Sequence, residues 1–172
     1  MNGIGLMIGM GGAARYSLSS TRPDSDTHRT AFTHALLLAA LCALFFSFAG
    51  AFCSEEISAI LGADHDTIGY ASDYIRILLL FSPLFLGNNL LLCFVRNDGA
   101  PRLSMAGMLI GSLANIVLDY IFIYPLGMEM AGAATATATA PVISMLIMSV
   151  HFIKKNNRFH ICLLYTSPSP RD

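Results

Sequence analysis

The chain has 172 residues and a formal net charge of −1, and 55% of its residues are hydrophobic while 12% are charged. Soluble domains carry about 25% charged residues, so a mean hydropathy of +0.61 excludes an ordinary water-soluble domain and indicates a membrane protein. No basic patch interleaved with aromatic residues occurs, so the sequence gives no support for nucleic-acid binding.

The first apolar stretch, Met1–Ala14, is shorter than a membrane span, because crossing the hydrocarbon core takes about 20 apolar residues. It is predicted to be a short span or a span whose beginning is missing, and the second interpretation is favoured. A secretory signal peptide would carry a basic segment first, and nothing basic precedes Arg15. The Gly5–Gly9 repeat in this stretch, like Gly107–Gly111, predicts a small surface where two membrane helices pack closely.

The longer uncharged stretches predict complete membrane spans. In chain order they are Thr30–Ser54, Ile77–Val95, Leu103–Leu126, which is interrupted only by Asp119, and Met130–Ile153. Pro83 and Pro141 lie inside two of them, where a missing N–H favours a kink. The predicted fold class is therefore all-α, a polytopic transmembrane helix bundle.

The basic residues predict the orientation of the bundle, because cytoplasmic loops hold an excess of Lys and Arg. If each span reverses direction, one face carries Arg15, Arg22, Arg29, Arg96, Arg102, Lys154, Lys155 and Arg158. The opposite loops, Cys53–Asp73 and Tyr124–Glu129, contain no basic residue. The basic loops are therefore predicted to be cytoplasmic. Arg76 is the exception, and is expected to pair locally with Asp73 or to extend its charge to the interface.

A stripe of small and polar residues marks the span that holds Asp119. Gly107, Gly111, Asn115 and Asp119 recur every four residues, so they share one helix face, with Ser112 beside it. An ionisable residue within a span is costly and is by default a functional-site hypothesis. A carboxylate and an amide one turn apart offer ligands to a small cation, or a proton site. A cap, or a pair with an arginine near the outer boundary, is the equally weighted alternative.

Other polar residues lie at membrane depth on the neighbouring spans. Asn88 and Asn89 follow Pro83 and must find partners inside the bundle, which makes them weak candidates for a substrate cavity together with Ser112. Thr137 shares a helix face with Pro141 and Ser144, although a threonine hydroxyl in a helix usually bonds the carbonyl four residues back.

The sequence does not predict an enzyme or a structural metal site. Its cysteines and histidines are scattered, without the spacing that metal ligands or a disulfide framework would require. No local pattern joins a nucleophile to a base, and no cofactor motif is present.

Several ordered runs resemble the multidrug and toxic compound extrusion (MATE) transporters. They are Arg96-Asn-Asp-Gly-Ala-Pro-Arg-Leu-Ser-Met, Met108-Leu-Ile-Gly, Asn115-Ile-Val-Leu-Asp-Tyr-Ile-Phe-Ile and Met130-Ala-Gly-Ala-Ala. The segment Gly3–Ser17 resembles the second span of that family. The resemblance runs in order from about residue 1 to 155. It divides the chain into residues 1–158, a partial MATE N-lobe with spans two to six, and residues 159–172, a tail unlike the family that is foreign or disordered.

The resemblance implies a twelve-span antiporter of two six-helix lobes in the plasma membrane, which exports organic, often cationic compounds in exchange for H+ or Na+. Asn115 and Asp119 match the family's cation-coupling pair on span five, and Thr137 matches the threonine on span six. No cofactor is implied beyond the coupling ion. The expected partners are the lipid bilayer, the small organic substrates, and the missing span one and C-lobe. A related lipid-linked oligosaccharide flippase, with more cationic residues in its cavity, is the alternative.

Two departures from the family pattern stand out. Glu129 occupies a position where the family usually shows glycine, and Thr135 and Thr139 replace aliphatic residues. With span one and the second lobe absent, the chain by itself is not expected to transport, because alternating access needs two halves that move around a central site.

Overall fold

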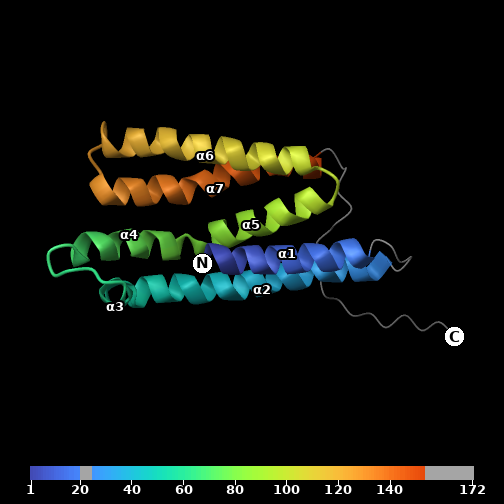
Figure 1. Cartoon of the computed structure of the whole chain (residues 1–172), viewed down its shortest axis with the longest axis horizontal. Coiled ribbons are helices and arrows are strands. Elements are labelled where there is room, and N and C mark those ends of the chain that lie inside the picture. Colours follow the sequence, from blue (N-terminus) through green and yellow to red (C-terminus); the bar gives the residue numbers. More distant parts are fainter. Residues whose placement is uncertain (20–24, 154–172) are drawn as a thin grey trace.

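The computed structural model describes residues 1–19 and 25–153, and places the side chains of residues 1–18 and 31–150. The described residues form helices and no strand, which confirms the predicted helix bundle. The helices are α1 (Asn2–Ser19), α2 (Ser25–Phe52), α3 (Ser54–Ile60), α4 (Ile68–Leu80), α5 (Ser82–Asn97), α6 (Pro101–Ile123) and α7 (Glu129–Ile153). Helices α6 and α7 lie side by side on one side of the bundle, α1 and α2 form the other, and α5 lies between them (Figure 1).

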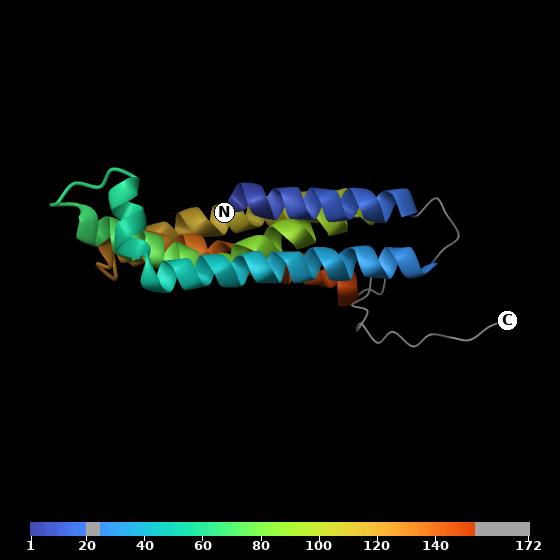
Figure 2. The same ribbon diagram turned by 90° about the horizontal axis from the view of Figure 1, so that it is seen from below.

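Three of the predicted membrane spans are confirmed by length and composition. Among the described residues, the helical segments able to cross a bilayer are Ala31–Phe52, Pro101–Ile123 and Glu129–Val150. Large apolar side chains such as Phe45, Leu113 and Ile116 are each more than 60% exposed on these helices, as lipid-facing residues are. The stretch Met1–Ala14 lies in α1 from Asn2 onward, and this 18-residue helix begins beside the middle of the bundle (Figure 2).

The predicted span Ile77–Val95 is wrong at its start and is not one straight helix. Helix α4 begins at Ile68, and α4 and α5 are long and apolar enough to cross a bilayer only as a pair, bent by 49°. The predicted loop Cys53–Asp73 accordingly contains α3, which lies across the end of the bundle (Figure 2), and the first part of α4. Asp73 and Arg76 are exposed on α4. A helix can continue through such residues into water, because its backbone hydrogen bonds do not depend on the surroundings of its side chains.

The bend between α4 and α5 confirms the kink expected at Pro83. Proline has no N–H, so the carbonyl of Leu79 loses the donor four residues on and instead accepts a backbone N–H at the end of α4. Helix α2 pairs with the break through side chains: Ser47 Oγ donates to the carbonyl of Leu80 at 3.2 Å, and Ser82 Oγ donates to the carbonyl of Ala43 at 3.0 Å. Neighbouring serines commonly satisfy backbone groups at breaks inside membranes. Helix α7 instead continues as one helix through Pro141.

The two glycine repeats lie at close helix contacts, as predicted. A Cβ atom at Gly9 would lie 3.0 Å from Cys93 Sγ and 3.1 Å from the carbonyl oxygen of Asn89, so α1 touches α5 there. A Cβ atom at Gly111 would lie 3.1 Å from Ser144 Cβ, so α6 touches α7. Small residues permit such approaches, which supply the van der Waals contact that holds membrane helices together.

Aromatic residues fill the contact among α1, α2 and α5. Phe94 is fully buried and meets Phe32 edge-on at a ring distance of 4.9 Å and Tyr16 at 5.9 Å. The Tyr16 hydroxyl donates to Asp98 Oδ1 at 2.7 Å. This hydrogen bond ties the last turns of α1 to the connection after α5.

Glu129 has a backbone φ of +46°, in the left-handed region that favours glycine. It is also the position at which the sequence departs from the glycine expected by resemblance. The Glu129→Gly variant is therefore expected to raise the free energy of unfolding by about 1 kcal/mol, because an L side chain in this region costs about 1–2 kcal/mol. Denaturant titration of both proteins in the same micelles, followed by circular dichroism, measures the difference. A less stable glycine variant would contradict the expected strain.

Candidate functional site

A polar cavity of the described residues lies among α1, α5, α6 and α7 and has a volume of about 350 Å³. It is lined by Asn2, Leu6, Phe85, Asn88, Asn89, Met108, Gly111, Ser112, Asn115, Thr137, Ala140, Pro141 and Ser144. The fold thus brings five residues predicted for the coupling site or the substrate cavity to one place, although they come from three separate spans.

Two asparagines of α5 form one wall. Asn88 Oδ1 is buried and has no hydrogen-bond partner. Asn89 Nδ2 lies 3.4 Å from Asn2 Oδ1, to which it donates a long hydrogen bond. Beyond its 49° bend from α4, helix α5 lies between α1 and the α6–α7 pair (Figure 1), and both asparagines line the cavity there.

Helix α6 contributes Ser112 and Asn115. The Ser112 side chain is exposed, whereas Asn115 is half-buried and its Nδ2 atom has no hydrogen-bond partner. Gly111, a turn before Asn115, lets α6 lie directly against Ser144 of α7. The small residue therefore sets how closely the two polar walls approach.

Helix α7 contributes Thr137 and Ser144. Thr137 Oγ1 donates to the carbonyl of Ala133 at 2.9 Å, so its proton is used within the helix and only its lone pairs remain for a ligand. Pro141 has no N–H to donate to the carbonyl of Thr137, which leaves a second acceptor at this level. Thr135 and Thr139 bond the carbonyls four residues back in the same way as Thr137.

Ser144 was not among the predicted site residues. It is 3% exposed, and its Oγ atom has no hydrogen-bond partner although it lines the cavity. Its helix face, shared with Thr137 and Pro141, was the available sequence signal. A serine on such a face is usually satisfied by its own helix, so sequence alone could not distinguish it.

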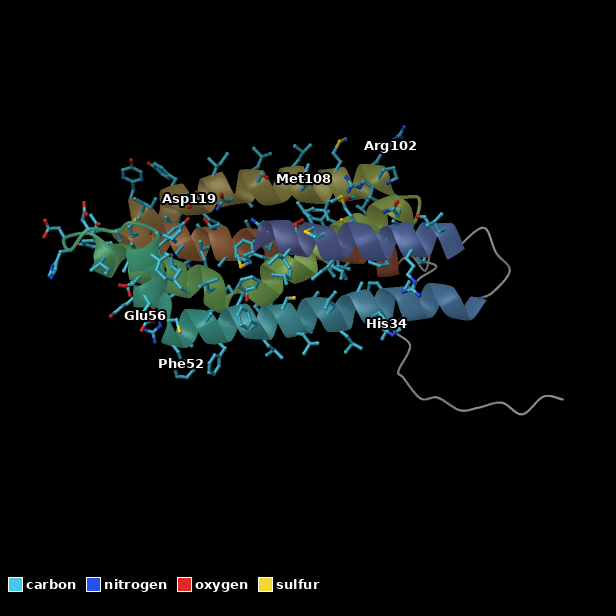
Figure 3. All side chains as sticks on the ribbon, turned by 60° about the horizontal axis from the view of Figure 1, so that its bottom comes forward. His34, Phe52, Glu56, Arg102, Met108 and Asp119 are labelled. Atoms are coloured by element: carbon cyan, nitrogen blue, oxygen red, sulfur yellow. The ribbon has the colours of Figure 1, made fainter. Side chains whose placement is uncertain are left out.

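Asp119 lies one turn beyond Asn115 and does not line the cavity itself. Its Oδ1 atom is buried without a hydrogen-bond partner, and among the described residues it forms no ion pair, so the alternative of a pair with an arginine is not supported there. Asp119 and Arg102 lie toward opposite ends of α6, and Glu56 lies at the same end of the bundle as Asp119 (Figure 3).

The unpartnered atoms make this cavity a candidate binding site. Leaving a buried donor or acceptor unpaired costs about 1–3 kcal/mol, and such atoms in native structures call for a ligand, a water or an ion. Here they gather on α5, α6 and α7, as Asn88 Oδ1, Asn115 Nδ2, Asp119 Oδ1 and Ser144 Oγ. The cavity offers both donors and acceptors and has no charged side chain in its described lining. Within the described ranges, no group of three or more His, Cys, Asp or Glu residues is placed to hold a metal ion.

Comparison with known proteins gives a consistent set of relatives. The family model named MatE matches residues 2–121, which include Asn88, Asn115 and Asp119. The "Multidrug export protein MepA" of Staphylococcus saprophyticus is 31% identical over 97% of this chain. The protein of the same name from Staphylococcus aureus is 34% identical over 67% of the chain.

A solved structure shares the fold. An inward-facing multidrug resistance MATE family transporter of the MOP superfamily superimposes with a TM-score of 0.88 and 27% identity over 98% of this chain. The chain spans 38% of that structure, 37% of the S. saprophyticus protein and 26% of the S. aureus protein.

Proposed function

Because this chain belongs to the MATE family of efflux transporters, we propose that it supplies part of an antiporter that exports organic, often cationic compounds in exchange for H+ or Na+. The protein would lie in the plasma membrane as a multi-pass bundle with its basic loops in the cytoplasm. The described relatives are multidrug exporters, which supports this substrate class.

The observation that carries the proposal is the set of unpartnered polar atoms around the cavity. A structural bundle would satisfy Asn88, Asn115 and Ser144 internally, because nothing in the hydrocarbon core can do so. A transporter instead needs polar groups that pair with a passing ligand and then release it. Amides and a hydroxyl suit this task, because each hydrogen bond contributes only about 0.5–1.5 kcal/mol.

The absence of charged side chains from the described cavity lining favours drug export over the flippase alternative. A flippase for lipid-linked oligosaccharides would favour cationic side chains around the phosphate groups of its substrate, and none occurs in the described lining. An uncharged cavity beside the buried carboxyl of Asp119 suits organic cations better.

The proposed coupling residues are Asp119, Asn115 and Thr137. Asp119 would accept the proton or bind the sodium ion, and Asn115, one turn before it, would supply an amide oxygen. Thr137 would add a hydroxyl oxygen or its backbone carbonyl from α7. Binding of the ion between α6 and α7 would then favour one arrangement of the two helices over the other, which is how an ion drives a transporter.

The cavity makes a direct prediction. In cells expressing the complete transporter that contains these residues, Asn115→Leu is expected to reduce export of a cationic dye such as ethidium by about tenfold. The variant removes one polar contact and narrows the cavity, and about 1.4 kcal/mol corresponds to tenfold. Dye fluorescence in energised cells measures the rate of export.

The matched control is Asn97→Leu, because Asn97 is an exposed asparagine at the end of α5 and lies outside the cavity lining. Export should be unchanged in that variant. Loss of export in both variants, or in neither, would count against the cavity as the export site.

A further inference from the structure

A second cavity, distinct from the proposed transport cavity, lies between α1 and α2 and has a volume of about 370 Å³. Its lining is mainly apolar, with two basic side chains, Arg15 and His34, at one end. The lining residues are Met7, Ile8, Gly11, Gly12, Arg15, Ala31, His34, Ala35 and Leu38. None of these residues takes part in the coupling site, and no carboxylate occurs in the described lining. We propose that this groove binds an anionic phospholipid, with the phosphate at Arg15 and His34 and an acyl chain along the apolar part.

The shape of the groove follows from two adjacent glycines. A Cβ atom at Gly12 would lie 2.7 Å from Ala35 Cβ, so the two helices touch and close the floor of the groove. A Cβ atom at Gly11 would meet nothing within 4 Å, so the space in front of that floor is open. The walls are apolar and face outward, since Met7 is 72% and Leu38 51% exposed. Surfaces of this kind contact acyl chains when the bundle is in a bilayer.

The position of the charges suits a headgroup. His34 lies in the first turn of the candidate span Ala31–Phe52, and Arg15 lies in the last two turns of α1. Both side chains are exposed, and His34 is at the same end of the bundle as Arg102 (Figure 3). The groove therefore has its cationic end at the expected depth of the interface and its apolar part deeper.

The chemistry selects an anionic lipid over other occupants. Among the described residues, Arg15 makes no hydrogen bond and no ion pair, so its guanidinium is available for a phosphate, which it can bind through two parallel hydrogen bonds. Basic pockets between membrane helices bind the headgroups of anionic lipids in this manner. The organic cations proposed for transport would be repelled by Arg15, and a free anion would gain nothing from the apolar walls.

Native mass spectrometry of the purified chain tests the proposal, with phosphatidylglycerol and phosphatidylcholine of identical acyl chains supplied in equal, substoichiometric amounts. The phosphatidylglycerol adduct is expected to exceed the phosphatidylcholine adduct by about fivefold, and Arg15→Gln should remove most of that preference, because each basic residue at a charged surface contributes roughly this factor. His34→Gln should also lower the preference for phosphatidylglycerol. Gly11→Leu should remove the adduct while both basic side chains remain.

Matched controls separate the groove from general effects. Arg102→Gln removes an exposed basic charge at the same end of the bundle but outside the groove, and Gly3→Leu adds the same side chain to α1 at an open position outside the lining. Both should keep the preference, and circular dichroism checks that every variant is folded. If Gly11→Leu does not fold, the lipid preference of Arg15→Gln compared with that of Arg102→Gln tests the site.

Three outcomes would overturn the lipid site. They are equal binding of the two lipids by the unaltered chain, an equal effect of Arg102→Gln and Arg15→Gln, and a dimer of the chain that Gly11→Leu dissociates. The last outcome would assign the groove to a second copy of the protein. The transport assays do not depend on this result, so the two proposals can fail separately.

Discussion

Replacing Asp119 with asparagine is expected to reduce ion-driven efflux by about 10- to 100-fold in the complete transporter that contains this chain. Asparagine keeps the size and shape of the side chain and removes the negative charge that would hold a proton or a sodium ion. An energetic coupling of 1–3 kcal/mol between ion and substrate corresponds to about 5- to 150-fold, which sets the size of the effect. The measurement is the rate of dye export driven by an imposed proton or sodium gradient.

Glu56→Gln is the matched control for Asp119→Asn. Glu56 is an exposed carboxylate at the same end of the bundle (Figure 3), so the control changes the charge there without touching the buried site. Efflux should be preserved in it. If Asp119→Asn instead exported at the unaltered rate under the same gradient, the carboxyl group would have no part in coupling.

A second readout distinguishes coupling from damage to the fold. A ligand that binds only the folded state stabilises it by an amount that grows with the logarithm of the ligand concentration once that exceeds Kd. Sodium ions should therefore raise the thermal stability of the unaltered protein but not that of Asp119→Asn. A variant that loses efflux but still responds to the ion would place Asp119 in another step of transport.

The Gly50→Ala variant is expected to lower the free energy of unfolding by about 1–3 kcal/mol, the usual cost of forcing extra volume into a packed contact. A Cβ atom at Gly50 would overlap Leu79 Cβ and would lie 3.2 Å from the backbone of Leu79 and Leu80. These atoms cannot rotate away, because they are backbone or attached directly to it. Helix α2 must therefore move away from the bend, and this would lengthen the contact from Ser47 to the carbonyl of Leu80.

Gly69→Ala is the control for Gly50→Ala. Gly69 lies on α4, the helix that Gly50 contacts, and a Cβ atom there would meet nothing within 4 Å. Alanine is the better helix former, so this variant should be unchanged or more stable by up to about 1 kcal/mol. Denaturant titration in micelles measures the free energy of unfolding of both variants. Equal stability of Gly50→Ala and the unaltered protein would show that α2 and α4 can separate there at little cost.

Local sequence properties determined the membrane-spanning elements. A charge-free run of the required length must span or be buried, because the transfer free energy of its side chains depends on composition and not on the rest of the fold. The same reasoning located the bend near Pro83 but did not distinguish it from Pro141, through which α7 continues as one helix, because the missing N–H permits a break and the surrounding contacts decide whether it occurs. The close contacts at Gly9 and Gly111 also followed from a local pattern, since only a small residue lets two backbones approach.

Hydropathy did not reveal where α4 begins. The residues from Ile68 to Arg76 are polar enough to suggest a loop, yet they continue the helix beyond the segment first predicted to span the membrane. Charge patterns indicate the membrane depth at which a side chain is stable, whereas helix boundaries follow from backbone hydrogen bonding and packing.

The sequence by itself determined that Asp119 and Asn115 share a helix face and that each polar residue needs a partner, because both follow from the helical repeat and from the absence of water in the bilayer core. Only the tertiary structure decided that Asn88, Asn115 and Ser144 line one cavity while Asp119 lies a turn beyond it. The rotation and tilt of each helix are set by its contacts with its neighbours, and those contacts join residues that are far apart in the chain.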